Sequence, residues 1–166
     1  AIDTEGEMFY VYDCYRASKA SPAVHSEIIR GRPHFIPIAY PHDGNRRDSM
    51  GNPGLADQYR NLGCNFLLEH FTNPPALGNN KGSNSIEEGL MAMIQAMEGG
   101  KFKVFSTLGD WFEEFRMYHR KQNKVVPFRD DLMSATRYAF QSQRFAVAGK
   151  DPTWTQDVEY RNYGII

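Results

Sequence analysis

Short runs of strand-forming residues alternate with segments of helical spacing along most of this chain of 166 residues. The strand-type runs, rich in β-branched and aromatic residues, cover 7–15, 35–40, 65–69 and 102–105. Helices are predicted at 21–30, 55–62, 85–98, from about 111 and from about 130. Because parallel strands need long crossover connections, this order predicts an α/β domain with a largely parallel sheet.

Local signals mark the ends of several predicted helices. Ser21 is placed to cap a helix whose first residue is Pro22, and Gly31 is expected to end it. Ser85 and Glu88 have the spacing of a capping box, in which each side chain bonds the backbone N–H of the other residue. These signals fix where two of the helices should begin.

A further amphipathic helix is predicted around residue 111. Its apolar face would carry Trp111, Phe112, Phe115 and Tyr118. Its polar side would carry Glu113, Glu114, Arg120 and Lys121. Residues 124–128 are then expected to form an extended joint that leads into the last main helix.

The composition indicates a folded domain and excludes several classes of protein. Apolar residues make up 41% of the chain, which is enough for a core, and 19 basic against 20 acidic residues give a formal charge of −1. DNA binding would therefore depend on a local basic patch. No run approaches the roughly 20 apolar residues of a membrane span. Cys14 and Cys64 belong to no metal-binding motif and are expected to be buried, reduced thiols, which fits an intracellular compartment.

One carboxylate follows directly on a predicted strand. The stretch F-I-P-I-A-Y-P-H-D-G at 35–44 passes from an apolar run into a turn that holds Asp43. Ligands of open α/β sheets bind in the crevice at the carboxyl ends of the strands, where Asp43 is expected to lie. An Asx turn with Gly44 is the plain structural alternative.

Two further carboxylates, Asp130 and Asp131, stand at the predicted start of the last main helix. Asp is a favoured N-cap and suits the positive end of the helix dipole, so capping alone explains one of them. Two adjacent carboxylates also leave one or both free to bind a cation. Oxygen ligands such as these and Asp43 suit Mg²⁺ or Mn²⁺, and two such ions can clamp a phosphodiester during hydrolysis.

At this point the chain resembles a known family, the nuclease domain of the large terminase subunit of tailed bacteriophages. The resemblance rests on F-Y-V-Y-D-C-Y-R at 9–16, I-A-Y-P-H-D-G at 38–44, S-I-E-E-G-L at 85–90 and F-R-D-D-L-M-S-A-T-R-Y-A at 128–139. It implies an RNase H-like fold with a central mixed, mostly parallel sheet flanked by helices. It also implies a two-metal-ion endonuclease that cuts concatemeric double-stranded DNA during genome packaging.

The resemblance assigns roles to particular residues and partners. Asp43 matches the second acidic motif of the family, and Asp130 and Asp131 match the last, with Asp131 favoured as the principal ligand of Mg²⁺ or Mn²⁺. The implied partners are double-stranded DNA, the small terminase subunit and the portal protein, in the host cytoplasm and without a membrane. Arg46, Arg47, Lys81 and Arg129 are candidate DNA-phosphate contacts, although each is equally well explained as a solvated loop charge.

The chain departs from the family pattern at its start. The turn signal at 3–6 matches the hairpin turn that follows the family's opening strands, so the strand with the first catalytic Asp is expected to be missing from this sequence. Asp3 and Asp13 do not match that ligand. The chain is therefore expected to be an N-terminally incomplete nuclease domain over 1–149 with a C-terminal extension over 150–166, unless it is inactive or another residue substitutes.

Two other functions remain open from the sequence. One is a different RNase H-like nuclease, of the junction resolvase or transposase type. The other is a non-catalytic docking module of the packaging motor, in which the extension from residue 150 contacts a partner. Nucleophilic catalysis is not indicated, because Ser106 and the cysteines have no plausible triad partners.

Overall fold

The computed structural model describes residues 1–3, 5, 7–47, 49–75, 77–78, 80–122 and 124–148. The C-terminal extension expected over 150–166 lies outside these residues. None of the helices in the described ranges is long and apolar enough to cross a membrane. Cys64 is buried, Cys14 is only partly buried, and both are free thiols.

A small mixed sheet forms one side of the molecule. Its strands are β1 (Ile2–Asp3), β2 (Met8–Val11) and β3 (Phe102–Val104), with β2 in the middle. β1 pairs antiparallel with β2, and β3 pairs parallel with β2. The strand predicted over 7–15 covers only Met8–Val11 in the structure and is shorter than expected.

The segments predicted as strands at 35–40 and 65–69 run side by side but form no extended ladder. A single parallel bridge joins Ile38 to Phe66, with Ile38 N–H donating to Asn65 and Leu67 N–H donating back to Ile38. Pro37 has no N–H to offer a ladder at the preceding position. The two predicted strands are thus wrong as regular strands, although their parallel direction agrees with the predicted parallel sheet.

The helices confirm most of the sequence prediction. Their bounds are α1 (Pro22–Arg30), η1 (His42–Asn45), α2 (Leu55–Asn61), α3 (Ile86–Glu98), α4 (Gly109–Met117), α5 (Asp131–Gln141) and η2 (Gln143–Phe145). Ser21 and Ser85 cap α1 and α3 as predicted, accepting hydrogen bonds from the N–H groups of Val24 and Glu88. The other half of the capping box is wrong, because the Glu88 carboxylate accepts from Ser83 and Asn73 instead.

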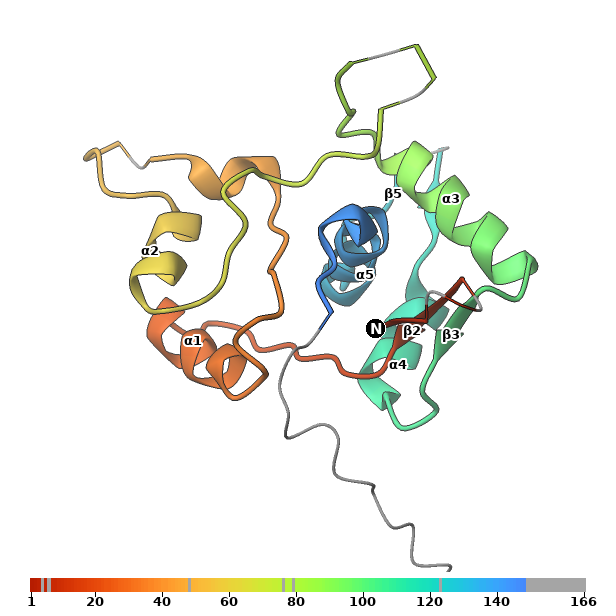
Figure 1. Cartoon of the computed structure of the whole chain (residues 1–166), viewed down its shortest axis with the longest axis horizontal. Coiled ribbons are helices and arrows are strands. Elements are labelled where there is room, and N and C mark those ends of the chain that lie inside the picture. The colour runs from red at the N-terminus through yellow and green to blue at the C-terminus, as the bar shows by residue number, and fades with distance from the viewer. Residues whose placement is uncertain are drawn as a thin grey trace, which may run out of the picture.

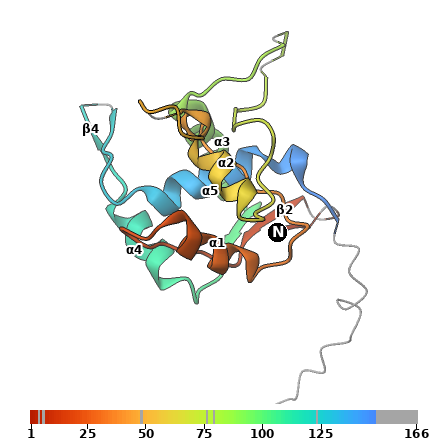
Figure 2. The same ribbon diagram turned by 90° about the vertical axis from the view of Figure 1, so that its left-hand side faces the viewer.

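The segment after α4 also differs from the prediction. The helix ends at Met117, so Arg120 and Lys121 lie in a strand and not on its polar face. They form β4 (Arg120–Lys121), which pairs antiparallel with β5 (Lys124–Val125) where an extended joint was expected. Figure 2 shows this hairpin projecting away from the rest of the molecule.

Helix α5 occupies the centre of the molecule (Figure 1). The sheet, α3 and α4 lie on one side of it, and α1, η1 and α2 lie on the other. Both α3 and α4 pack directly on α5. This packing places Glu114 of α4 beside the start of α5, which carries Asp130 and Asp131.

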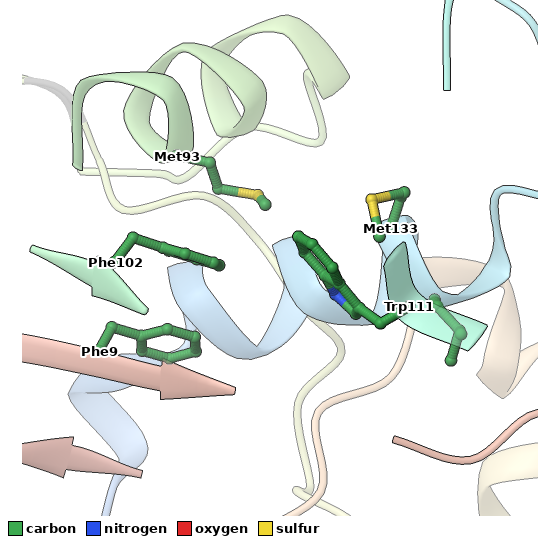
Figure 3. Close-up of a cluster of buried hydrophobic side chains, with 6 residues drawn as sticks. Phe9, Met93, Phe102, Trp111 and Met133 are labelled. Carbon is green, nitrogen blue, oxygen red and sulfur yellow. The ribbon is translucent and has the colours of Figure 1, made fainter. Parts of the chain in front are cut away.

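The hydrophobic core lies between the sheet, α3, α4 and α5 (Figure 3). It is built from Phe9, Met93, Phe102, Trp111, Leu132 and Met133. Trp111 is almost fully buried, and its Nε1–H donates to Thr136 Oγ1 at 2.9 Å. Burial of these side chains attaches α5 firmly to the sheet.

Candidate metal and DNA site

Asp43 lies in η1, the short helical turn that follows the 35–40 segment. The turn is closed by backbone bonds, with Gly44 N–H donating to Pro41 and Arg46 N–H donating to Asp43. The Asp43 side chain is exposed, and its carboxylate forms no hydrogen bond or ion pair with the residues that the structure describes. The Asx turn considered from the sequence is therefore not what shapes this loop.

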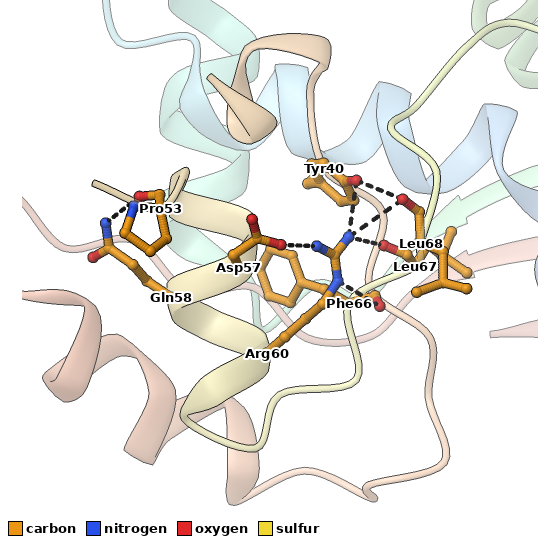
Figure 4. A network of polar contacts seen from close by, with 8 residues as sticks. All are labelled: Tyr40, Pro53, Asp57, Gln58, Arg60, Phe66, Leu67 and Leu68. Atoms are coloured by element: carbon orange, nitrogen blue, oxygen red, sulfur yellow. Dashed lines mark hydrogen bonds and ion pairs between the residues drawn. The ribbon is translucent and has the colours of Figure 1, made fainter. Parts of the chain in front are cut away.

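The chain leading into this turn is held by Arg60 of α2 (Figure 4). The Arg60 guanidinium donates to the hydroxyl of buried Tyr40 at 2.9 Å and pairs with Asp57 at 2.6 Å. It also donates to the carbonyls of Phe66, Leu67 and Leu68, which a regular strand would have offered to a neighbour. One side chain thus replaces part of a sheet ladder and fixes both segments.

Close packing completes the support of the Asp43 turn. A Cβ added at Gly44 would lie 2.7 Å from the Tyr40 ring, and one at Gly54 would lie 2.7 Å from the Gly44 carbonyl oxygen. Both glycines are needed because the backbone passes close to its neighbours there. Asp43 is consequently presented to solvent from a well-anchored loop.

Asp130 and Asp131 lie where α5 begins. Asp130 is the N-cap residue, but its side chain makes no capping bond; its Oδ2 accepts from Ser134 Oγ at 3.4 Å. Asp131, the first helical residue, is exposed and has no hydrogen-bond or ion-pair partner in the described ranges. Capping therefore does not occupy the Asp131 carboxylate, which stays available.

A carboxylate from another helix caps α5 instead. Glu114 of α4 is fully buried, and its Oε1 accepts from the Met133 N–H at 2.8 Å. Its Oε2 accepts from Arg16 at 3.1 Å. The prediction that Glu114 faces solvent is wrong, although the sequence contained the signal: position 114 follows Trp111 by three and precedes Tyr118 by four, which places all of them on one helical face.

Asp131 opens onto a depression of about 260 Å³. Its lining consists of Tyr15, Arg16, Ala17, His25, Asp131, Leu132 and Ala135. Arg16 thus contacts the buried Glu114 and also lines the depression beside Asp131. The sequence analysis did not identify Arg16 as a candidate residue. Asp43 is not among the lining residues, so the structure does not place it in this depression.

The four candidate DNA-contacting residues come from three different loops. Arg46 and Arg47 follow η1 and are exposed, with Arg47 at 3.5 Å from the Gly51 carbonyl. Lys81 is exposed in the loop before α3. Arg129 precedes α5 and pairs with Glu113 at 2.9 Å, so part of its charge is already neutralised.

The donor chemistry of the site fits a hard divalent cation. Asp43 and Asp131 offer unpaired carboxylates, and Mg²⁺ is commonly bound by one or two carboxylates with water and phosphate oxygens. Among the described residues, no three His, Cys, Asp or Glu side chains gather closely enough to hold a metal ion. Asp43 and Asp131 alone therefore do not complete a ligand set.

The mixed sheet and its flanking helices form an α/β domain, as predicted, and comparison with known proteins places it in the RNase H-like class. The chain belongs to the Terminase RNaseH-like domain family, whose family model matches residues 1–143. It is similar to the solved nuclease domain of the P22 large terminase, with a TM-score of 0.75 and 35% identity over 87% of this chain and 72% of that one. The resemblance inferred from the motifs is thereby confirmed.

Two curated relatives agree with this family. The large terminase subunit of Salmonella phage P22 is 35% identical over 150 residues, which are 90% of this chain and 29% of the relative. The large terminase subunit of Enterobacteria phage LP7 is 35% identical over 139 residues, which are 83% of this chain and 28% of the relative. The chain therefore spans less than a third of the length of these relatives.

Proposed function

We propose that this chain is the endonuclease part of a viral packaging terminase and hydrolyses phosphodiester bonds of concatemeric double-stranded DNA. Membership of the terminase family supports the packaging role. The observation that carries the chemistry is the pair of unpaired carboxylates, Asp43 and Asp131, each presented from the anchored start of a helical turn. In the full-length protein, the partners would be the DNA, the small terminase subunit and the portal, in the host cytoplasm.

The proposed cofactor is Mg²⁺ or Mn²⁺, with two ions expected. Bound divalent ions would supply an activated water and stabilise the leaving oxygen of the cut strand. Asp43 and Asp131 are the proposed ligands, and Asp130 is a supporting group because Ser134 already engages its carboxylate. The remaining ligands would have to come from outside the described residues, in accord with the absence of a three-residue cluster there.

Arg46 and Arg47 are the proposed contacts to the DNA backbone. They follow Asp43 by three and four residues and extend from the same anchored loop. Phosphate contacts of this kind would position the duplex without reading its sequence, which suits a nuclease with little sequence preference.

The proposal is tested by nicking of supercoiled plasmid with the full-length protein in a titration of Mg²⁺ and Mn²⁺. Asp43→Asn and Asp131→Asn are each expected to lower the rate by more than about 100-fold, because a lost ligand costs more than a lost supporting contact. Asp110→Asn is the matched control, since Asp110 is an exposed carboxylate in the first turn of α4. It is expected to cut at the wild-type rate.

Four results would go against the proposal. Cutting that persists in EDTA would exclude the metal mechanism, and full activity of Asp43→Asn would exclude that ligand. A strong preference for branched DNA over plasmid would favour a junction resolvase type of nuclease. Absence of both cutting and metal binding would leave a docking role in the packaging motor.

A further inference from the structure

We propose that Glu114 is a positioning residue that holds Arg16 and the start of α5 in one fixed arrangement and so sets the affinity of Asp131 for a divalent ion. This inference rests on the proposed function. It starts from an unusual feature of α4, a glutamate whose side chain has no exposed surface at all.

The two oxygens of Glu114 bind two different parts of the fold. Oε1 accepts from the backbone N–H of Met133, two residues after Asp131. Oε2 accepts from Nη1 of Arg16, which follows β2. Glu114 therefore connects α4, α5 and the chain beyond the sheet through bonds of 2.8 and 3.1 Å.

The bond to Met133 replaces the cap that Asp130 does not provide. The first N–H groups of a helix lack partners within the helix, and a side-chain acceptor usually comes from the N-cap residue. Here the N-cap residue, Asp130, makes no such bond. Because Glu114 supplies the acceptor, neither carboxylate at the start of α5 caps the helix, and that of Asp131 has no hydrogen-bond or ion-pair partner among the described residues.

A second contact of the same helix reinforces the arrangement. Glu113, the neighbour of Glu114, pairs with Arg129 at 2.9 Å and with Arg16 at 3.7 Å. Arg129 directly precedes Asp130, and its backbone has a positive φ of 48°. The chain is thus held on both sides of Asp130 and Asp131 by two consecutive glutamates of α4.

Burial gives this network its rigidity. Water cannot replace the partners of a fully buried carboxylate, so loss of the Glu114 side chain would leave the Met133 N–H unsatisfied and Arg16 with only its longer ion pair to Glu113. Groups that orient a metal ligand typically change metal affinity or activity by about 10- to 100-fold when they are mutated. Arg16 also lines the depression next to Asp131, so a displaced Arg16 would alter the same surface.

The test measures Mn²⁺ binding by calorimetry and hydrogen exchange at the Met133 amide, both in the full-length protein without DNA. Glu114→Gln keeps an oxygen for the Met133 N–H but loses the charge that holds Arg16. Arg16→Met keeps Glu114 and removes its partner. Both variants are expected to weaken Mn²⁺ binding by about 10-fold or more, and Glu114→Ala is expected also to speed exchange at Met133.

Two controls separate positioning from general destabilisation. Glu98→Gln changes an exposed glutamate at the end of α3 and is expected to bind Mn²⁺ like the wild type. Phe9→Leu removes packing against Phe102 and Phe140, not a bond of the cap, and is expected to lower the unfolding temperature without changing Mn²⁺ affinity. Glu114→Asp is expected to bind more weakly than the wild type, because the shorter side chain cannot reach both partners.

The inference fails if Glu114→Gln and Arg16→Met bind Mn²⁺ as tightly as the wild type. It also fails if Phe9→Leu weakens binding as much as they do, because the effect would then follow stability alone. Absence of Mn²⁺ binding by the wild type is a different result, which would overturn the proposed function itself.

Discussion

The guanidinium of Arg60 donates a hydrogen bond to the hydroxyl of Tyr40 at 2.9 Å, and this pair joins α2 to the segment that leads to Asp43. The Tyr40 hydroxyl donates in turn to the Leu68 carbonyl at 3.0 Å. The two segments share only one β-bridge, at Ile38 and Phe66. Their relative position therefore depends on side-chain hydrogen bonds more than on a sheet ladder.

Replacement of Arg60 by Ala is expected to lower the free energy of unfolding by about 2–3 kcal/mol, because partly buried carbonyls lose their donor and Asp57 loses its partner. Tyr40→Phe removes only a hydroxyl and should cost about 1 kcal/mol. Urea unfolding followed by tryptophan fluorescence measures both. Arg47→Ala, in an exposed loop, should stay within about 0.5 kcal/mol of the wild type. Equal stability of the Arg60 and Arg47 variants would contradict this role.

Gly89 tests the packing between α3 and α5. A Cβ at Gly89 would lie 2.7 Å from Cδ of Arg137, a buried side chain whose guanidinium lies over the rings of Phe71 and Tyr138. Gly89→Ala is therefore expected to destabilise the protein by about 1–3 kcal/mol, although alanine is the better helix former.

Gly109 provides the matched control, because it begins α4 and a Cβ there would meet nothing within 4 Å. Gly109→Ala is expected to leave stability unchanged or raise it by up to about 1 kcal/mol. Thermal unfolding of both variants, measured side by side, gives the sign of each change. A gain in stability for Gly89→Ala would show that Arg137 moves aside at little cost.

The sequence predicted what depends on local signals and missed what depends on distant partners. Ser21 and Ser85 were recognised as caps because the acceptor and the N–H are three residues apart. The role of Glu114 depends on Arg16, 98 positions away, and on Met133, and no local pattern contains either contact. Its burial was still foreseeable, since it shares a helical face with Trp111.

The candidate site shows the same contrast between local signals, which the sequence contains, and contacts of distant residues, which it does not. Asp43, Asp130 and Asp131 are candidates because carboxylates at the ends of predicted strands and helices are visible in a linear pattern. The sequence pattern could not show that Glu114 caps α5 in place of Asp130, because this contact depends on how α4 packs against α5. The regular strands predicted at 35–40 and 65–69 are wrong. Strand propensity carries no information about the hydrogen bonds that Arg60 donates to the carbonyls of Phe66 and Leu68.

Stability is expected to fall in alkaline solution. Burial raises the pKa of the Cys14 thiol above its ordinary 9.0, and burial likewise raises the pKa of Tyr59 and Tyr118 above 10.0. The nearby Asp130 carboxylate adds to the rise of the Tyr118 pKa. Between the ordinary and the raised pKa the unfolded chain loses these protons first, so their contribution is complete below pH 9 and is lost as pH rises further.

Urea midpoints at pH 8 and pH 10.5 measure this effect, and Tyr118→Phe isolates one contribution. The variant is expected to lose less stability than the wild type between the two pH values, because the phenylalanine does not titrate. An equal decline in both proteins would show that Tyr118 has the same pKa in the folded and unfolded states.

The proposed DNA contacts of Arg46 and Arg47 are tested by the salt dependence of binding. Each phosphate contact that is lost should lower the slope of log K against log of the salt concentration by about 1. Full-length protein in EDTA, which prevents cutting, is titrated with a fluorescent duplex at several salt concentrations. The double variant Arg46→Ala/Arg47→Ala is expected to lower the slope by about 2, equally for duplexes of different sequence.

Lys103→Ala is the control, because Lys103 is an exposed lysine of β3, on the opposite side of α5 from the Asp43 loop. It removes a positive charge and is expected to leave the slope unchanged. If the Lys103 variant and the arginine variant change the slope equally per charge removed, the loss reflects net charge and not contacts. A slope that depends on the duplex sequence would instead indicate that one of the arginines reads base edges.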